Sequence, residues 1–264
     1  MLSAVVVNLR PVAVAHLPFS HGTFAYAAAL ELFLRQNPTL ARTLHEMRPY
    51  KPFTVSPLLN THLKDDNGFI LSPQETYSWR LTGLIEEVSQ YLLSLSPASG
   101  GVRIGDAVFT IDEVIVEKHP ETGQVTYEEL WKRWGEIEPK RMVTFHFVTP
   151  TTFRSSRFEE PFPLPKWVFG SLLEIWNTFS THPIGQIKGL FEEVVLLSNW
   201  KGETRRVELG GYRTVGFIGK FTYRFTEPTQ KLCQWASMLS EFAFYSGVGW
   251  QTTHGLGQVR VEFR

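Results

Sequence analysis

A single histidine, His45, lies between two arginines on a short segment, residues 38–48, that reads as a helix. It falls about 100° from the apolar stripe of this helix, so its side chain is expected on the polar face. Arg42 and Arg48 lie three residues to either side and would share that face. Imidazole exchanges a proton near neutral pH, and guanidinium groups bind anions. The pattern suits proton transfer beside a phosphate; a surface histidine on a solvated basic helix is the alternative.

A second stretch that could bind a ligand is GVGWQTTHGLGQVRV, residues 247–261, whose four glycines follow the pattern G-x-G-x5-G-x-G. The loop follows a predicted helix and leads into a predicted strand, whereas a dinucleotide fingerprint or a P-loop opens a helix whose N-terminus holds phosphate. Gly247 is explained as the left-handed C-cap of the preceding helix. This cap does not explain Gly249, Gly255 and Gly257. Glycine has no side chain, so another main chain can approach it closely. We expect a loop that binds a ligand backbone, with a structural turn as the alternative.

Polar side chains near these glycines would add to such binding. Thr252 and His254 lie between the two glycine pairs. We interpret His254 as a binding residue first and as an alternative catalytic residue second. Lys220 and Arg224 alternate along the predicted strand GKFTYRF, so they would project from one sheet face and could follow a phosphate backbone.

The composition narrows the class of protein. The chain has 264 residues with 26 basic and 26 acidic side chains, so a local basic patch must hold any anionic partner. A single cysteine, Cys233, excludes an internal disulfide framework and a cysteine zinc cluster. No H-E-x-x-H, C-x-x-C or acidic cluster with metal-ligand spacing occurs, so no metal and no other cofactor is predicted. With no leader and no apolar run of about 20 residues, we expect a cytoplasmic protein without a membrane partner.

The predicted elements follow the same order in both halves of the chain. Each half reads strand, helix, strand, strand, helix, strand. In the second half, FEEVVLLSNW, residues 191–200, is predicted to be a strand. The order predicts an α+β fold of tandem ferredoxin-like (RRM-like) β-α-β-β-α-β domains. The segment KHPETGQ, residues 118–124, is the predicted linker, which places the domains at residues 1–120 and 121–264.

Two stretches resemble a known family. LSEFAFYSGVGWQTTHGLGQVRV, residues 239–261, is similar to the glycine-rich signature of the CRISPR-associated endoribonucleases that process precursor CRISPR RNA, members of the RAMP superfamily. Residues 17–58, with their L-H dipeptide and K-x-F-T-x-S-P-L strand, resemble the first helix and the following segment of the same enzymes. The resemblance implies one or two ferredoxin-like domains, in agreement with the element order. Some RAMP members that share the glycine motif bind RNA without cutting it.

The resemblance implies a catalytic site and a reaction. A histidine at the position of His45 is the usual general acid or base, and a lysine at the position of Lys51 usually assists by stabilising charge. Some members add a tyrosine on the first helix, where this chain has Leu30, so Tyr26, one helical turn earlier, and Tyr50 are the candidates for that role. The implied reaction is metal-independent cleavage of CRISPR repeat RNA by its own 2′-hydroxyl, which leaves a 2′,3′-cyclic phosphate and a 5′-hydroxyl end.

The same resemblance implies RNA-binding residues and partners. We expect RNA contacts from the basic residues and the glycine loop, namely Arg42, Arg48, Lys220, Arg224, Gly247, Gly249, Thr252, His254, Gly255 and Gly257. The expected partner is CRISPR repeat RNA, with subunits of a CRISPR effector complex or a second copy of the chain in a homodimer as further partners. The alternatives are a non-catalytic RNA-binding subunit of such a complex and an unrelated ferredoxin-like binding module.

Overall fold

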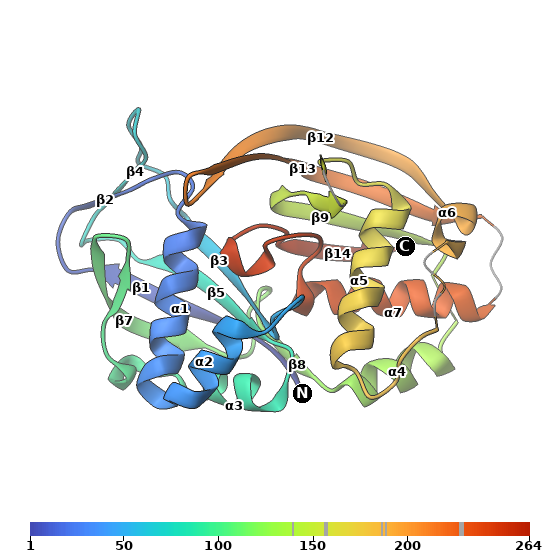
Figure 1. Ribbon diagram of the computed structural model, residues 1–264, viewed down its shortest axis with the longest axis horizontal. Coiled ribbons are helices and arrows are strands. Elements are labelled where there is room, and N and C mark those ends of the chain that lie inside the picture. The colour runs from blue at the N-terminus through green and yellow to red at the C-terminus, as the bar shows by residue number, and fades with distance from the viewer. Residues whose placement is uncertain (139, 156–157, 186, 188, 227–229) are drawn as a thin grey trace. The chain divides into compact units, whose positions relative to one another are not determined.

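The chain folds into two compact units. The computed structural model describes residues 1–138, 140–155, 158–185, 187, 189–226 and 230–264 (Figure 1). The first unit comprises Met1–Gln124, Leu209–Gly211 and Thr253–Gly255, and the second comprises Val125–Glu208, Tyr212–Thr252 and Leu256–Arg264. The first unit is therefore built from three stretches of the chain, and one of them is part of the glycine loop.

The first unit is an antiparallel sheet with helices packed on one face. Its strands run in the order β3-β5-β1-β7-β6, with β1 (Leu2–Pro11), β3 (Phe53–Leu59), β5 (Tyr77–Gly83), β6 (Val102–Ile104) and β7 (Ala107–Ile115). The helices are α1 (Gly22–Gln36), α2 (Pro38–Glu46) and α3 (Glu86–Ser94). Alternate residues of β1, namely Val5, Val7 and Leu9, share one buried cluster with residues of α1 and α3, so both helices cover the same face. Figure 1 shows α1 and α2 side by side.

Short elements complete this unit. Strands β2 (Ala15–Leu17) and β4 (Phe69–Leu71) form a separate antiparallel pair, and a 3₁₀ turn, η1, covers Pro97–Ser99. Strand β8 (Gly123–Val125) begins inside the segment that the sequence marks as a linker.

The second unit repeats the arrangement. Its sheet has the order β12-β13-β9-β14, with β9 (Met142–Thr151), β12 (Val195–Leu209), β13 (Tyr212–Phe225) and β14 (Val259–Phe263). Its helices are α4 (Tyr127–Glu136), α5 (Pro165–Phe179), α6 (Leu190–Val194) and α7 (Gln230–Ser246); β10 (Phe153–Ser155) pairs with β11 (Phe158–Glu160), and a 3₁₀ turn, η2, covers Thr252–His254. The core is aromatic: Phe169 of α5 meets Phe145 of β9 and Tyr223 of β13 edge-on, with ring centroids 5.9 and 5.4 Å apart.

The predicted α+β class and the tandem ferredoxin-like order are confirmed. In both units the second strand of the motif pairs with the third, the third with the first, and the first with the fourth. One predicted strand begins late, because residues 190–194 form α6 and the chain becomes extended only at Val195. Glu192 and Glu193 lie in the first turn of α6, where acidic side chains stabilise a helix. Within the described residues, no helix has the length and apolar character needed to cross a membrane.

Candidate active site

Helix α2 presents His45 to solvent. The helix begins at Asn37, whose side-chain oxygen accepts a hydrogen bond of 3.0 Å from the N–H of Leu40, and a proline follows in the first turn. Leu44 is fully buried and anchors the helix in the core, whereas His45, the next residue, is exposed. This agrees with the predicted position of the imidazole off the apolar stripe.

The helix is shorter than predicted, and this changes the place of Arg48. Helix α2 ends at Glu46, and Arg48 precedes a proline, which disfavours a helical conformation for it. Arg48 therefore does not share a helical face with Arg42 and His45, and that prediction is wrong. Its guanidinium instead donates hydrogen bonds to the carbonyl oxygens of His45 and Met47, at 2.9 and 2.8 Å. Arg42 lies on the helix and is exposed.

Lys51 binds the same end of α2. Its Nζ donates hydrogen bonds to the carbonyl oxygens of Leu44 and His45, each 2.6 Å long. A cation suits this position, because the last carbonyl groups carry the negative end of the helix dipole. Burial, and then the nearby charge of Arg48, lower the pKa of Lys51 to about 8. The lysine is thus fixed beside His45 and is mostly charged at neutral pH.

Tyr26 reaches His45 from helix α1. Its side chain is 8% exposed, and its hydroxyl oxygen lies 3.2 Å from Nδ1 of His45. Burial raises the pKa of the phenol, with a smaller opposing effect of Arg48, so the hydroxyl keeps its proton. It can donate a hydrogen bond to Nδ1 or accept one from it, depending on the tautomer of the imidazole. Leu30, one turn further along α1, packs against the core, and Tyr50 is half-buried. Tyr26 therefore contacts the histidine directly, through a hydrogen bond.

The tip of the glycine loop lies against Tyr26. The ring of His254 stacks on the ring of Tyr26, with centroids 4.3 Å apart and planes inclined by 24°. Its Nδ1 lies 2.9 Å from the hydroxyl oxygen of Thr253. Burial, and then the charge of Lys51, lower the pKa of His254 to about 4. The imidazole is therefore neutral near pH 7. Gly22 permits this contact, since a Cβ there would collide with the carbonyl group of His254.

The four glycines adopt conformations that favour glycine, and residues of the loop and of neighbouring segments pack closely around them. All have positive φ: 65° at Gly247, 86° at Gly249, 87° at Gly255 and 69° at Gly257. A Cβ on Gly249 would lie 2.5 Å from the carbonyl oxygen of Thr152, and one on Gly257 would lie closer than 3.0 Å to that of Val248. Thr252 packs against Gly247 and Gly257 through its methyl group. Close main-chain approach is thus present within the loop, and RNA contact by these residues stays a prediction.

The predicted basic stripe lies on the sheet of the second unit. Lys220 and Arg224 are both exposed on β13 and, with Thr222 between them, project from one face. Lys220 is opposite His146 of β9, which is in turn opposite Arg260 of β14. Three residues that carry or can carry positive charge therefore form a row across this face.

An aromatic and basic cluster surrounds Trp250 of the glycine loop, and the sequence pattern does not predict it. The guanidinium of Arg154 lies 5.2 Å from the ring centroid of Trp250, and the ring of Tyr212 stands perpendicular to Trp250 at 5.9 Å. Tyr212 is 46% exposed, and the main-chain N–H of Trp250 donates to the carbonyl oxygen of Thr152 at 2.8 Å. The tryptophan inside the glycine motif was the available signal, because exposed aromatic rings beside arginine can stack with bases.

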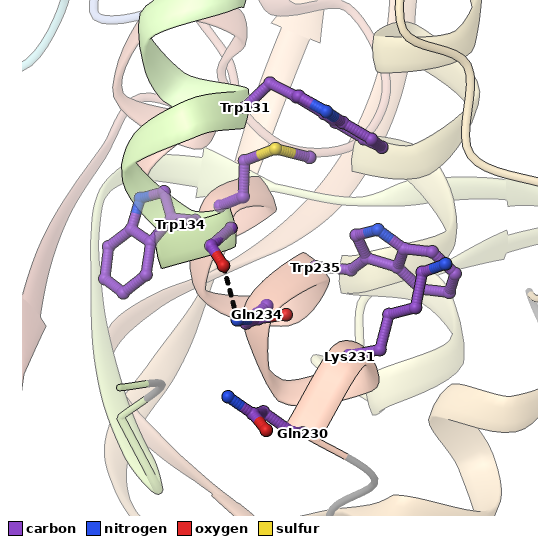
Figure 2. Close-up of a pocket in the computed structure, with 8 residues that line it drawn as sticks. Trp131, Trp134, Gln230, Lys231, Gln234 and Trp235 are labelled. Atoms are coloured by element: carbon purple, nitrogen blue, oxygen red, sulfur yellow. Dashed lines mark hydrogen bonds between the residues drawn. The ribbon is translucent and has the colours of Figure 1, made fainter. Parts of the chain in front are cut away.

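A separate pocket of about 260 Å³ lies between α4 and α7 of the second unit. Figure 2 shows Trp131, Trp134 and Trp235 around it, and the amide of Gln234 donates to the carbonyl oxygen of Gly135 at 3.1 Å. The ammonium of Lys231 lies 5.1 Å from the centroid of the Trp235 ring. None of the predicted site residues lines this pocket. In the part of the chain that the structure describes, no three His, Cys, Asp or Glu side chains group as metal ligands would.

Comparisons with known proteins identify relatives of part of the chain. A family model described as CRISPR-associated endoribonuclease Cas6 matches residues 145–259. The CRISPR-associated endoribonuclease Cas6 of Streptococcus thermophilus is 26% identical over 157 residues, which cover 58% of this chain and 64% of that protein. The Cas6 endoribonuclease of Mycobacterium tuberculosis is 27% identical over 124 residues, which cover 46% of this chain and 39% of that protein. The chain thus spans less than two thirds of the curated relatives that it matches.

Solved structures match over nearly the whole chain. A product complex of Thermus thermophilus Cas6 (TTHB231) has a TM-score of 0.81 and 29% identity, covering 99% of this chain and 100% of that one. A Cas6 (TTHA0078) substrate mimic complex has a TM-score of 0.72 and 26% identity, covering 99% of both chains. A Cas6-related protein of Pyrococcus furiosus, 15% identical with a TM-score of 0.68, shares the fold. With this shared fold and the partial match to the family model, the chain is similar to the Cas6 family of CRISPR-associated endoribonucleases.

Proposed function

We propose that the chain is an endoribonuclease that cleaves CRISPR repeat RNA into guide RNAs, in the cytoplasm and without a metal ion. The observation that carries the proposal is the grouping of Tyr26, His45 and Lys51 at the end of α2 in a chain that is similar to the Cas6 family. The names of the curated relatives, which are endoribonucleases, support RNA as the substrate.

The proposed reaction uses the RNA's own 2′-hydroxyl. The 2′-oxygen forms a bond to the adjacent phosphorus while the bond from phosphorus to the 5′-oxygen breaks, which leaves a 2′,3′-cyclic phosphate and a 5′-hydroxyl. A base takes the proton of the 2′-hydroxyl, and an acid gives a proton to the departing 5′-oxygen. His45 performs one of these transfers. Because its Nδ1 lies against the Tyr26 hydroxyl, Nε2 is the ring nitrogen that serves the RNA.

Lys51 supplies charge in this scheme. The transition state carries extra negative charge on the phosphate oxygens, which a nearby ammonium stabilises. With a pKa of about 8, Lys51 is about 90% charged at pH 7. Its two hydrogen bonds to main-chain oxygens fix the nitrogen beside α2, so the charge needs little reorganisation during the reaction.

RNA binding is proposed for groups in both units. Arg42 and Arg48 would contact phosphates near His45, and Lys220 and Arg224 would contact them along the β13 stripe. Gly247, Gly249, Gly255 and Gly257, with Thr252, would shape the loop that the RNA backbone meets. We further propose that residues 1–120 and 121–264 act as two domains, and that the chain meets CRISPR effector subunits or a second copy of itself.

The test is cleavage of end-labelled repeat RNA in EDTA. We expect cleavage to persist in EDTA, to stop when a 2′-deoxy sugar replaces the ribose at the cut, and to leave a cyclic phosphate by mass spectrometry. The His45→Ala variant should cut at least about 100-fold more slowly. A His16→Ala variant, whose histidine is 64% exposed on β2 of the same unit, is the matched control and should cut normally.

Other outcomes would select the alternatives. Tight RNA binding without cleavage by the wild-type protein would indicate the non-catalytic RNA-binding subunit. Absence of RNA affinity would indicate the unrelated binding module. Cleavage that EDTA abolishes and that added divalent metal restores would contradict the metal-independent reaction.

A further inference from the structure

His254, at the tip of the glycine loop, packs against Tyr26. The loop tip, Thr253–Gly255, belongs to the first unit and is seated there by two close contacts. The carbonyl group of His254 lies against Gly22 at the start of α1, where any larger residue would collide with it. A Cβ on Gly255 would lie 3.2 Å from Cδ of Pro57, so this glycine is also in tight contact. The main chain around His254 is therefore firmly placed.

Two other rings, besides that of His45, pack near the ring of Tyr26. His254 stacks on it at 4.3 Å. Phe53 of β3 is nearly parallel to it, with centroids 6.1 Å apart and planes inclined by 4°. Phe53 is almost fully buried and cannot move without disturbing the core. His254 is therefore the part of this stack that comes from outside the N-terminal elements, and it limits where the Tyr26 hydroxyl can point.

The surroundings of His254 do not suit it as a proton carrier or a phosphate ligand. Its Nδ1 lies next to the Thr253 hydroxyl, and burial and the charge of Lys51 both favour the neutral ring. A neutral stacked imidazole contributes an aromatic surface and no charge. These observations point away from the binding and catalytic roles that the sequence suggests for His254.

We propose that His254 is a positioning residue, which stacks on Tyr26 so that the Tyr26 hydroxyl stays against Nδ1 of His45. Nδ1–H of the His45 ring then donates to the hydroxyl oxygen, which leaves Nε2, the nitrogen assigned to the RNA, as the one that takes up or gives up a proton. This inference rests on the proposed function for its effect on cleavage. It gives the glycine motif a purpose that needs no contact with RNA.

Two substitutions separate the aromatic surface of His254 from its nitrogen chemistry. His254→Phe keeps a ring that can stack, and His254→Ala does not. In single-turnover cleavage of repeat RNA, we expect His254→Ala to be at least about 10-fold slower, because the imidazole of His45 loses its fixed orientation. His254→Phe should stay within about threefold of wild type. Both variants should bind RNA within about twofold of wild type, measured below the melting temperature of each.

A second measurement reads His45 without any cleavage. Long-range ¹H–¹⁵N spectra distinguish the two tautomers of a neutral histidine, and the signals of His45 are identified by their loss in His45→Ala. We expect the Nδ1–H tautomer of the neutral His45 ring in the wild type and in His254→Phe, and a mixture of tautomers in His254→Ala. This readout judges the positioning role even if the proposed function fails because the wild-type protein does not cut RNA.

Three results would overturn the inference. His254→Phe could be as slow as His254→Ala, which would show that the imidazole itself does chemistry. RNA affinity could fall in His254→Ala as much as cleavage does, which would make His254 an RNA contact. The His45 tautomer could be the same in all variants, which would show that the stack does not orient Tyr26.

Discussion

The substitution Gly257→Ala tests whether the fold or a ligand requires the glycines of the loop. Gly257 has φ of 69°, and a Cβ there would lie closer than 3.0 Å to the carbonyl oxygen of Val248. The left-handed conformation costs a residue with a Cβ about 1–2 kcal/mol. Relief of the clash would move Val248 and break the 2.9 Å hydrogen bond from its N–H to the Gly257 carbonyl, at about 1–3 kcal/mol. We expect the free energy of unfolding to fall by about 2–5 kcal/mol, which lowers the melting temperature by roughly 4–20 °C.

Two other glycines divide this cost into its parts. Gly211 also has positive φ, 92°, but no described atom lies within 4 Å of its Cβ position, so Gly211→Ala should show the conformational cost of about 1–2 kcal/mol alone. Gly135 lies in α4 with open space around it, and alanine there should stabilise the helix by about 1 kcal/mol.

The assay is thermal unfolding followed by circular dichroism, with repeat-RNA binding measured at a temperature where every variant is folded. We expect the melting temperature to be highest for Gly135→Ala, lower for Gly211→Ala and lowest for Gly257→Ala. If Gly257→Ala melted together with Gly211→Ala and yet lost RNA affinity, the close approach of Val248 would not explain this glycine and a ligand contact would.

Other perturbations test the remaining parts of the site. Because the pKa of Lys51 is about 8, its ammonium loses charge above that pH, and the rate of cleavage should decline on the alkaline side. Lys51→Arg should shift this decline to higher pH. Identical pH–rate profiles of the two proteins would exclude Lys51 as the cause of the decline. Tyr26→Phe keeps the ring and removes the hydroxyl, so single-turnover cleavage should slow about 10-fold with RNA affinity unchanged within about twofold, and full activity would show that the contact with His45 is idle. At the Trp250 cluster, Arg154→Ala should reduce the salt slope of RNA binding by about one, and Tyr212→Ala should weaken binding about fivefold or more at an unchanged slope; RNA binding that neither change affects would place the RNA elsewhere.

Local patterns were sufficient for the fold and for the exposure of His45. Strand alternation and helix stripes predict each main element of both units, because these patterns depend on which face is buried and not on distant partners. Asn37 followed by Pro38 predicts the start of α2, and the structure confirms this cap. The predicted end of the same helix is wrong, because the proline after Arg48 disfavours a helical conformation for that arginine.

The contacts of the site depend on tertiary packing, which spacing along one helix does not show. Tyr26 meets His45 because α1 and α2 pack side by side. The atoms that exclude a side chain at Gly249 and Gly257 belong to Thr152 and Val248, and only the folded loop brings them near. For the same reason, the sequence could name His254 but could not show that a buried, neutral ring would result.

The division of the first unit into three stretches has a consequence for biosynthesis. A ribosome completes Met1–Gln124 early, yet the ring that stacks on Tyr26 is encoded far downstream, within Thr253–Gly255. A nascent chain with a fully translated first stretch still lacks this ring. The stack can form only after translation has passed residue 254, so chains released prematurely would carry His45 and Tyr26 without the residue that packs against them.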